Sequence, residues 1–203
     1  MKKKALTLSG LFICSIVISV FTYLFPEQPY RYPYQPGTKE WDDLKTLQAR
    51  VEACQVPENL LPTMSTEAMA TTALNYPLIH NLYYFNTYKA AYDHIAARAN
   101  IFREFENRPD AGRILLQKYM DTPVTAVEQS FDLSDIEIIL AQDIYISKLN
   151  PQEIEELNIV AQCKYQDKLL AYGENDLFTK LFYIAISESE FQSDFVFPEG
   201  FAL

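Results

Sequence analysis

The chain has 203 residues, nearly half of them apolar, and its 27 acidic side chains outnumber 17 basic ones to give a net charge of −10. Phosphate backbones repel so acidic a chain, so nucleic-acid binding is not expected, and the apolar content argues against intrinsic disorder. Five glycines are few for a turn-rich β-sandwich, so the composition favours an all-α fold.

Residues 5–25 form an uncharged apolar segment that follows three lysines at positions 2–4. A helix of this length spans roughly 30 Å, the thickness of a bilayer's hydrocarbon core, and the lysines favour a cytoplasmic N-terminus. We expect residues 1–25 to be a membrane anchor, because the apolar run is long and has no small-x-small cleavage site. A cleaved signal peptide is the alternative, and lipid attachment at Cys14 is disfavoured by the bulky Ile13 before it.

Residues 26–38 contain four prolines and three tyrosines, a composition that favours an extended polyproline II stalk ahead of a domain spanning residues 39–203. In that domain, apolar residues recur at three- and four-residue spacing, which predicts helices. The strict 3.5-residue seam of residues 85–102 predicts the longest of them. The other expected helices cover residues 40–55, 65–74, 110–119, 134–146, 150–172 and 175–185.

Local signals mark several helix starts. Ser65 and Ser134 precede acidic residues and are predicted N-caps. Asn150 is followed by proline and then by Glu153, the arrangement of a capping box. We find no fixed-period repeat. We therefore predict one all-α domain of seven or eight helices, either an irregular α-α bundle or a short solenoid-like stack.

Two cysteines lie outside the leader. In an oxidising compartment Cys54 and Cys163 are candidates for a disulfide. The alternative is a pair of buried thiols that act as small apolar side chains, since each continues the apolar spacing of its helix. The sequence leaves both open.

No catalytic or metal-binding motif occurs in the chain: it has no glycine-rich phosphate loop, no GxSxG and no clustered Cys/His set. The spacing of His80 and His94 matches no metal site, and we expect neither a metal nor a cofactor. Asp143 lies in a helix predicted to be enclosed, where burial would raise its pKa and suit it to acid-base chemistry with Glu137 as a carboxylate partner. The alternative is a structural carboxylate that accepts hydrogen bonds.

Fourteen tyrosines are many for this length. Tyr88 and Tyr92 lie on the 3.5-residue seam and are expected in the core. Tyr83 and Tyr84 are expected in an exposed patch, where tyrosines commonly anchor a bound protein or peptide.

Several short motifs together resemble an uncharacterised family of exported bacterial proteins in which a proline-tyrosine segment precedes a helical domain. The likeness covers roughly residues 33–145 and implies export and a helical fold, without any activity or catalytic residue. The motifs, in chain order, are Trp41-x-x-Leu44, Cys54-Gln55-Val56-Pro57, Met64-Ser65-Thr66-Glu67-Ala68, Tyr76-Pro77-Leu78, Arg108-Pro109-Asp110-Ala111 and Leu140-Ala141-Gln142.

These observations predict a membrane-anchored, extracytoplasmic helical domain that is not an enzyme and binds another protein or peptide. A cleaved leader would make it a secreted protein instead. Two alternatives are a cell-envelope hydrolase that uses a carboxylate such as Asp143, and a purely structural component of the envelope.

Overall fold

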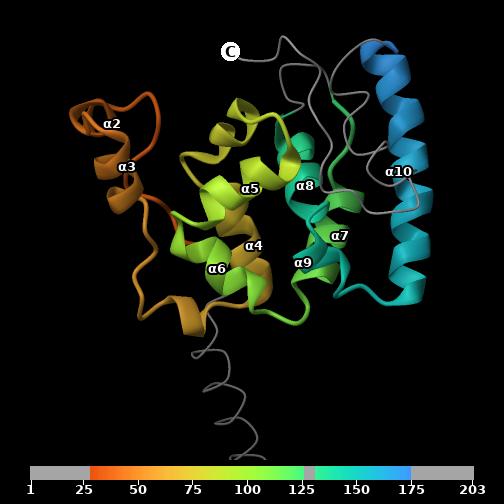
Figure 1. The fold of residues 1–203 in the computed structure, drawn as a ribbon, viewed down its shortest axis with the longest axis horizontal. Helices are drawn as coiled ribbons and strands as arrows, with labels where there is room; N and C mark the ends of the chain where they lie inside the picture. The colour runs from red at the N-terminus through yellow and green to blue at the C-terminus, as the bar shows by residue number, and fades with distance from the viewer. Residues whose placement is uncertain (1–27, 126–130, 175–203) are drawn as a thin grey trace, which may run out of the picture.

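The computed structural model describes residues 28–125 and 131–174 (Figure 1). The predicted anchor and the helix predicted at residues 175–185 lie outside these ranges. The regular structure of the described residues is entirely helical, which confirms the all-α prediction. It comprises α2 (Lys39–Asp43), α3 (Leu47–Ala53), η1 (Leu61–Thr63), α4 (Thr66–Leu74), η2 (Ile79–Tyr84), α5 (Tyr88–Ala96), α6 (Asn100–Glu106), α7 (Ala111–Asp121), α8 (Phe131–Leu140), α9 (Asp143–Ile146) and α10 (Pro151–Tyr172), where η marks a 3-10 helix.

The segment before α2 differs from the free stalk that its prolines suggested. Tyr32 is buried, and its ring packs edge-on against Tyr76 with centroids 5.9 Å apart. The Tyr30 N–H donates to the Thr72 hydroxyl of α4 at 2.9 Å. Residues 30–34 therefore lie against the helical body, because burying tyrosine rings stabilises this arrangement over full solvation of the chain.

The single helix predicted for residues 40–55 is two helices. The Thr46 hydroxyl accepts a hydrogen bond from the Ala49 N–H and begins α3 as an N-cap. Arg50 then donates to the carbonyl of Leu44 between the two helices, and its guanidinium lies 4.9 Å from the centre of the Trp41 ring. Trp41 is buried, but the predicted continuity of the helix over residues 40–55 was wrong.

The seam predicted as one long helix is also broken, between α5 and α6. Its inward residues are buried, Tyr88, Tyr92 and Phe102 among them. The chain leaves the helix because Asn100 bonds to a distant segment. The Asn100 N–H donates to Gln55, and its side-chain amide exchanges two hydrogen bonds with the backbone of Val56 at 3.0 and 2.7 Å.

A second break separates α8 from α9. The backbone becomes extended at Gln142, whose side-chain amide donates to the Ile138 carbonyl at 2.7 Å and so satisfies the end of α8. Ser134 is not an N-cap, since it lies inside α8 and is buried. The close packing of α7 against α9 requires a glycine at position 112 of α7. A Cβ atom there would lie only 2.2 Å from the carbonyl oxygen of Tyr145 in α9.

The longest of the described helices is α10, at 22 residues, and it lies at one edge of the described body beside α7 and α8 (Figure 1). The predicted capping box at Asn150 and Glu153 is confirmed, and Gly173 ends the helix with a φ of 88°. Among the helices of residues 28–125 and 131–174, none is long and apolar enough to cross a membrane.

Candidate functional site

A pocket of about 340 Å³ opens between α4, α7 and α8. Its apolar lining includes Leu74 of α4 and Ile136 of α8. Its charged lining consists of four carboxylates and one ammonium group, those of Glu67, Asp121, Asp132, Asp135 and Lys118. Each helix therefore contributes at least one acidic side chain, and the pocket is strongly negative.

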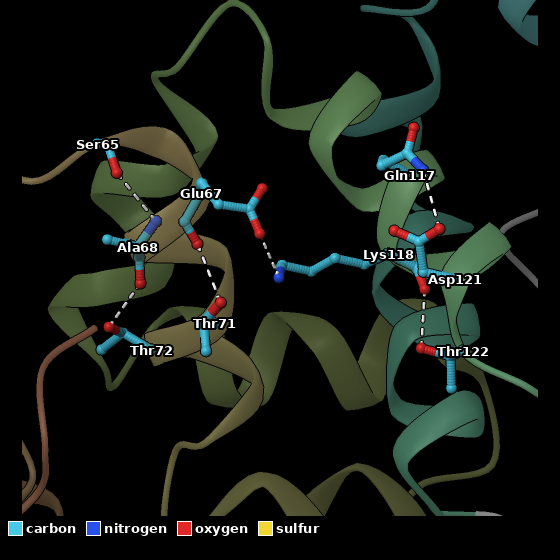
Figure 2. A network of polar contacts seen from close by, with 9 residues as sticks. All are labelled: Ser65, Glu67, Ala68, Thr71, Thr72, Gln117, Lys118, Asp121 and Thr122. Atoms are coloured by element: carbon cyan, nitrogen blue, oxygen red, sulfur yellow. Dashed lines mark hydrogen bonds and ion pairs between the residues drawn. The ribbon is translucent and has the colours of Figure 1, made fainter. Parts of the chain in front are cut away.

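The α4 wall is organised by the cap of that helix. The Ser65 hydroxyl accepts from the Ala68 N–H, as predicted, and this fixes the first turn that carries Glu67 (Figure 2). The Lys118 ammonium reaches from α7 to within 2.6 Å of the Glu67 carboxylate. The pair links two walls of the pocket, and its lysine is mostly buried, with a side chain 19% exposed against 57% for Glu67.

The α7 wall ends in Asp121, the last residue of that helix. An acidic residue at a helix C-terminus opposes the helix dipole, so local stability does not favour it there. Its carboxylate accepts a hydrogen bond from the amide of Gln117, one turn earlier, at 3.0 Å (Figure 2). The partner is neutral, and the Asp121 side chain lines the pocket.

The α8 wall presents Asp135, a carboxyl that is only 3% exposed. The Tyr83 hydroxyl donates to its Oδ1 atom at 2.8 Å. Burial raises the pKa of Asp135 to about 7, and the negative charge of Asp132 adds to this effect, whereas the Tyr83 hydrogen bond opposes it. Asp135 is thus a lining carboxyl whose charge changes near neutral pH.

The structure separates the two tyrosines that were predicted to form an exposed patch. Tyr84 is exposed, at 63%, but Tyr83 is buried at 5%, so the expected exposure of Tyr83 was wrong. Its ring packs edge-on against Phe131, while its hydroxyl holds Asp135. Tyr83 therefore contributes to the pocket as a positioning residue behind the wall.

The pocket does not have the geometry of a metal centre. Within the described residues, no group of three or more His, Cys, Asp or Glu side chains could hold a metal ion. The carboxylates are instead spread along three walls beside apolar side chains. Such a surface suits an organic cation whose charged group is carried on an apolar stem.

Comparison with known proteins does not assign this site. The chain matches no family model, no curated protein and no solved structure. The resemblance to an exported bacterial family stays a prediction, and the function has to be argued from the geometry.

Asp143 and Glu137, the carboxylates considered for catalysis, do not form a pair. Asp143 is the exposed first residue of α9 and lines a different pocket, of about 290 Å³, together with Tyr92 and Glu106. Glu137 is buried and bonds to Lys168 of α10. The expectation that Asp143 would be enclosed was wrong, because Gln142 turns the chain outward.

Each of the two histidines contacts an aromatic ring. The His80 ring packs against Phe131 at 5.3 Å between ring centres, and the His94 ring lies 4.6 Å from Phe85.

Sequence reasoning missed the pocket residues, although two local signals pointed to them. One is an acidic residue at the end of a helix, Asp121, and the other is an acidic residue inside the apolar run of α8, Asp135.

The two cysteines are free thiols in the structure, which has no bond between them. Cys54 is fully buried, and burial raises the pKa of its thiol to about 11. Cys163 is exposed on α10.

We expect a thiol reagent to label Cys163 within minutes at pH 8 and to label Cys54 only after unfolding. The reason is that a thiol reagent reacts with an accessible thiolate. The Cys54 side chain is buried, and its raised pKa keeps the thiol protonated at pH 8. Mass spectrometry of unreduced protein, with and without denaturant, gives the two rates. Failure of both cysteines to react in denaturant until a reductant is added would show that they are disulfide-bonded.

Proposed function

We propose that this protein is a binding module that recognises a basic segment of a partner protein or peptide, with a lysine or arginine side chain entering the pocket between α4, α7 and α8. The observation that carries the proposal is the charge of the lining, with four carboxylates from three helices against one ammonium group. An acidic cleft attracts cationic ligands and orients them before contact.

The shape and chemistry of the pocket support this class of ligand. Its volume of about 340 Å³ lies in the range of small-ligand sites and leaves room for one long side chain. Leu74 and Ile136 offer apolar surface for the methylene stem. The carboxylates offer acceptors for the ammonium or guanidinium head, whose hydrogen bonds are charge-assisted.

The N-terminal segment suggests where in the cell this binding takes place. We propose that residues 5–25 anchor the protein in a bacterial cytoplasmic membrane and that the helical body, with its pocket, faces the extracytoplasmic side. The partner would then be another protein or peptide of the cell envelope. A cleaved leader would release the same binding module as a secreted protein.

Titration of fluorescent peptides with the full chain in detergent tests the proposal. We expect a lysine-containing peptide to bind, and the same peptide with acetylated lysines to bind at least about tenfold more weakly, because acetylation removes the positive charge. Replacing Asp121 and Asp132 together by asparagine should weaken binding by about tenfold or more, since both supply negative charge to the pocket.

The matched control is the pair Asp42→Asn and Asp43→Asn, which removes the same charge from exposed positions of α2 outside the pocket. This control should change the Kd by less than about twofold at 150 mM salt, because screening weakens distant charges. Equal binding of the charged and acetylated peptides would contradict the proposal.

A hydrolase remains the second candidate, and one observation favours it. A general acid or base works best with a pKa near the working pH, and Asp135 combines such a pKa with a position in a pocket. In this alternative Asp135, and not Asp143, would act on the substrate. Turnover of a peptide, ester or glycoside that the Asp135→Asn variant loses would favour this candidate over binding alone.

A further inference from the structure

We infer that Lys118 divides the pocket into two parts, a closed end at Glu67 and an open end at Asp121, Asp132 and Asp135, and that the open end alone receives the cationic group of the ligand. This inference rests on the proposed function and deepens it, because it states where in the pocket the ligand's charge lies. Lys118 is thereby a specificity-determining residue of the site.

The closed end already contains a cation. Of the described residues that line the pocket, Lys118 is the one with a positive charge. Its side chain extends from α7 toward α4, and its ammonium lies 2.6 Å from the Glu67 carboxylate (Figure 2). The wall at Glu67 is thus occupied by a lysine of the protein itself. The same pair shows that a lysine head and stem fit against this lining.

The carboxylates of the open end form no direct ion pair with a cation of the described residues. Among the residues that the structure describes, none with a positive charge forms an ion pair with Asp121, Asp132 or Asp135. The hydrogen-bond donors to Asp121 and Asp135 are neutral, the Gln117 amide and the Tyr83 hydroxyl. Lys164, whose ammonium donates to the Thr122 carbonyl, attracts Asp121 without a direct ion pair. A direct ion pair with these carboxylates is therefore left to a ligand cation.

Asp135 presents an accessible acceptor atom to the open end. Its side chain is 3% exposed and lines the pocket. Within the described part of the chain, its hydrogen bond from Tyr83 goes to Oδ1, and no donor bonds to Oδ2. The Oδ2 atom is not one of the fully buried atoms without a partner, so it is open on the pocket side. A ligand N–H group in the open end can therefore donate to it.

The Lys118 ammonium fills the space beside Glu67, and it also repels the positive charge of the ligand. Two ammonium groups a few ångströms apart in a partly buried site repel each other appreciably. The ligand's charged group is therefore kept at the far side of the pocket from Glu67. Removal of the Lys118 charge should open both ends and raise the affinity for a cation.

The test compares charge variants of the full chain in the peptide titration described above, at 50 mM salt. Lys118→Met keeps most of the apolar stem and should lower the Kd for the lysine peptide by about 3- to 10-fold. Lys118→Arg keeps the charge and should leave the Kd within about twofold. Glu67→Gln leaves the Lys118 ammonium without its partner, free to compete at the open end, and should raise the Kd.

The matched control is Arg113→Met, which removes one positive charge from an exposed position of the same helix, outside the pocket. It should change the Kd by less than about twofold. A larger effect of Lys118→Met would then come from the charge inside the pocket and not from the net charge of the protein. Circular dichroism melting of each variant verifies that it is folded.

The outcomes separate this inference from the proposed function. If the unaltered protein binds the lysine and acetylated peptides alike, the proposed function fails. If it prefers the lysine peptide but Lys118→Met binds no more tightly than Arg113→Met, the division of the pocket is wrong. Preference of the unaltered protein for an acidic peptide, lost in Lys118→Met, would overturn both.

Discussion

Replacement of Lys168 by alanine is expected to lower the free energy of unfolding by about 3–5 kcal/mol. Its ammonium lies 2.5 and 2.6 Å from the two carboxylate oxygens of Glu137, and the side chains are 3% and 2% exposed. Burial acts to raise the pKa of Glu137, and the ammonium opposes this. Without Lys168, the carboxylate would keep only the Tyr119 hydroxyl and the charge of Lys164 as compensation, or would take up a proton at a cost in free energy.

Urea denaturation at pH 7, followed by circular dichroism, measures this effect. The double variant Glu137→Gln, Lys168→Met should recover most of the loss, because apolar or neutral replacements of a buried pair are often close to neutral in stability. The comparison variant is Lys89→Ala, whose partner Asp93 is an exposed acid one turn away, and it should cost less than about 1 kcal/mol. Equal losses for Lys168→Ala and Lys89→Ala would show that the buried pair contributes little.

This pair matters because of how α10 is attached to the body. The buried residues of α10 are Leu157, Ala161, Lys164 and Lys168, so two of the four are charged. The Lys164 ammonium donates to the Thr122 carbonyl at 2.5 Å and lies 5.2 Å from the centre of the Tyr119 ring. The attachment of α10 therefore depends on specific charge contacts as well as on apolar burial.

Replacement of Asp135 by asparagine is expected to stabilise the protein at pH 8 by up to about 4 kcal/mol and to have little effect at pH 4. The pKa of Asp135 is about 7 in the folded protein, above its ordinary value of 3.8. Between these two values the folded state binds more protons than the unfolded state, so stability falls as pH rises from about 4 to about 7. Asparagine is never charged and can still accept the Tyr83 hydrogen bond.

Urea unfolding of both proteins at pH 4, 6 and 8 gives the measurement. The difference between them should grow by about 1.4 kcal/mol per pH unit between pH 4 and 7 and then level off. Asp42→Asn, an exposed change on α2 outside the pocket, should leave the pH dependence of the unaltered protein nearly unchanged. Parallel curves for the unaltered protein and Asp135→Asn would refute the raised pKa.

The sequence by itself determined the features that depend on near neighbours in the chain. The all-α class was predicted from apolar residues at three- and four-residue spacing. The N-cap at Ser65 and the capping box at Asn150 were predicted because their hydrogen bonds join residues at most three positions apart. The burial of Tyr88 and Tyr92 was predicted because helical spacing brings such residues to one face.

Only the tertiary structure decided where the helices break and which polar groups are buried. Asn100 ends the predicted long helix through contacts with Gln55 and Val56, 45 and 44 residues away. Tyr83 reaches Asp135 across 52 residues, and Lys118 reaches Glu67 across 51. The energy of a polar side chain depends on the dielectric and the donors that other helices bring to it, and periodicity along one helix does not contain that information.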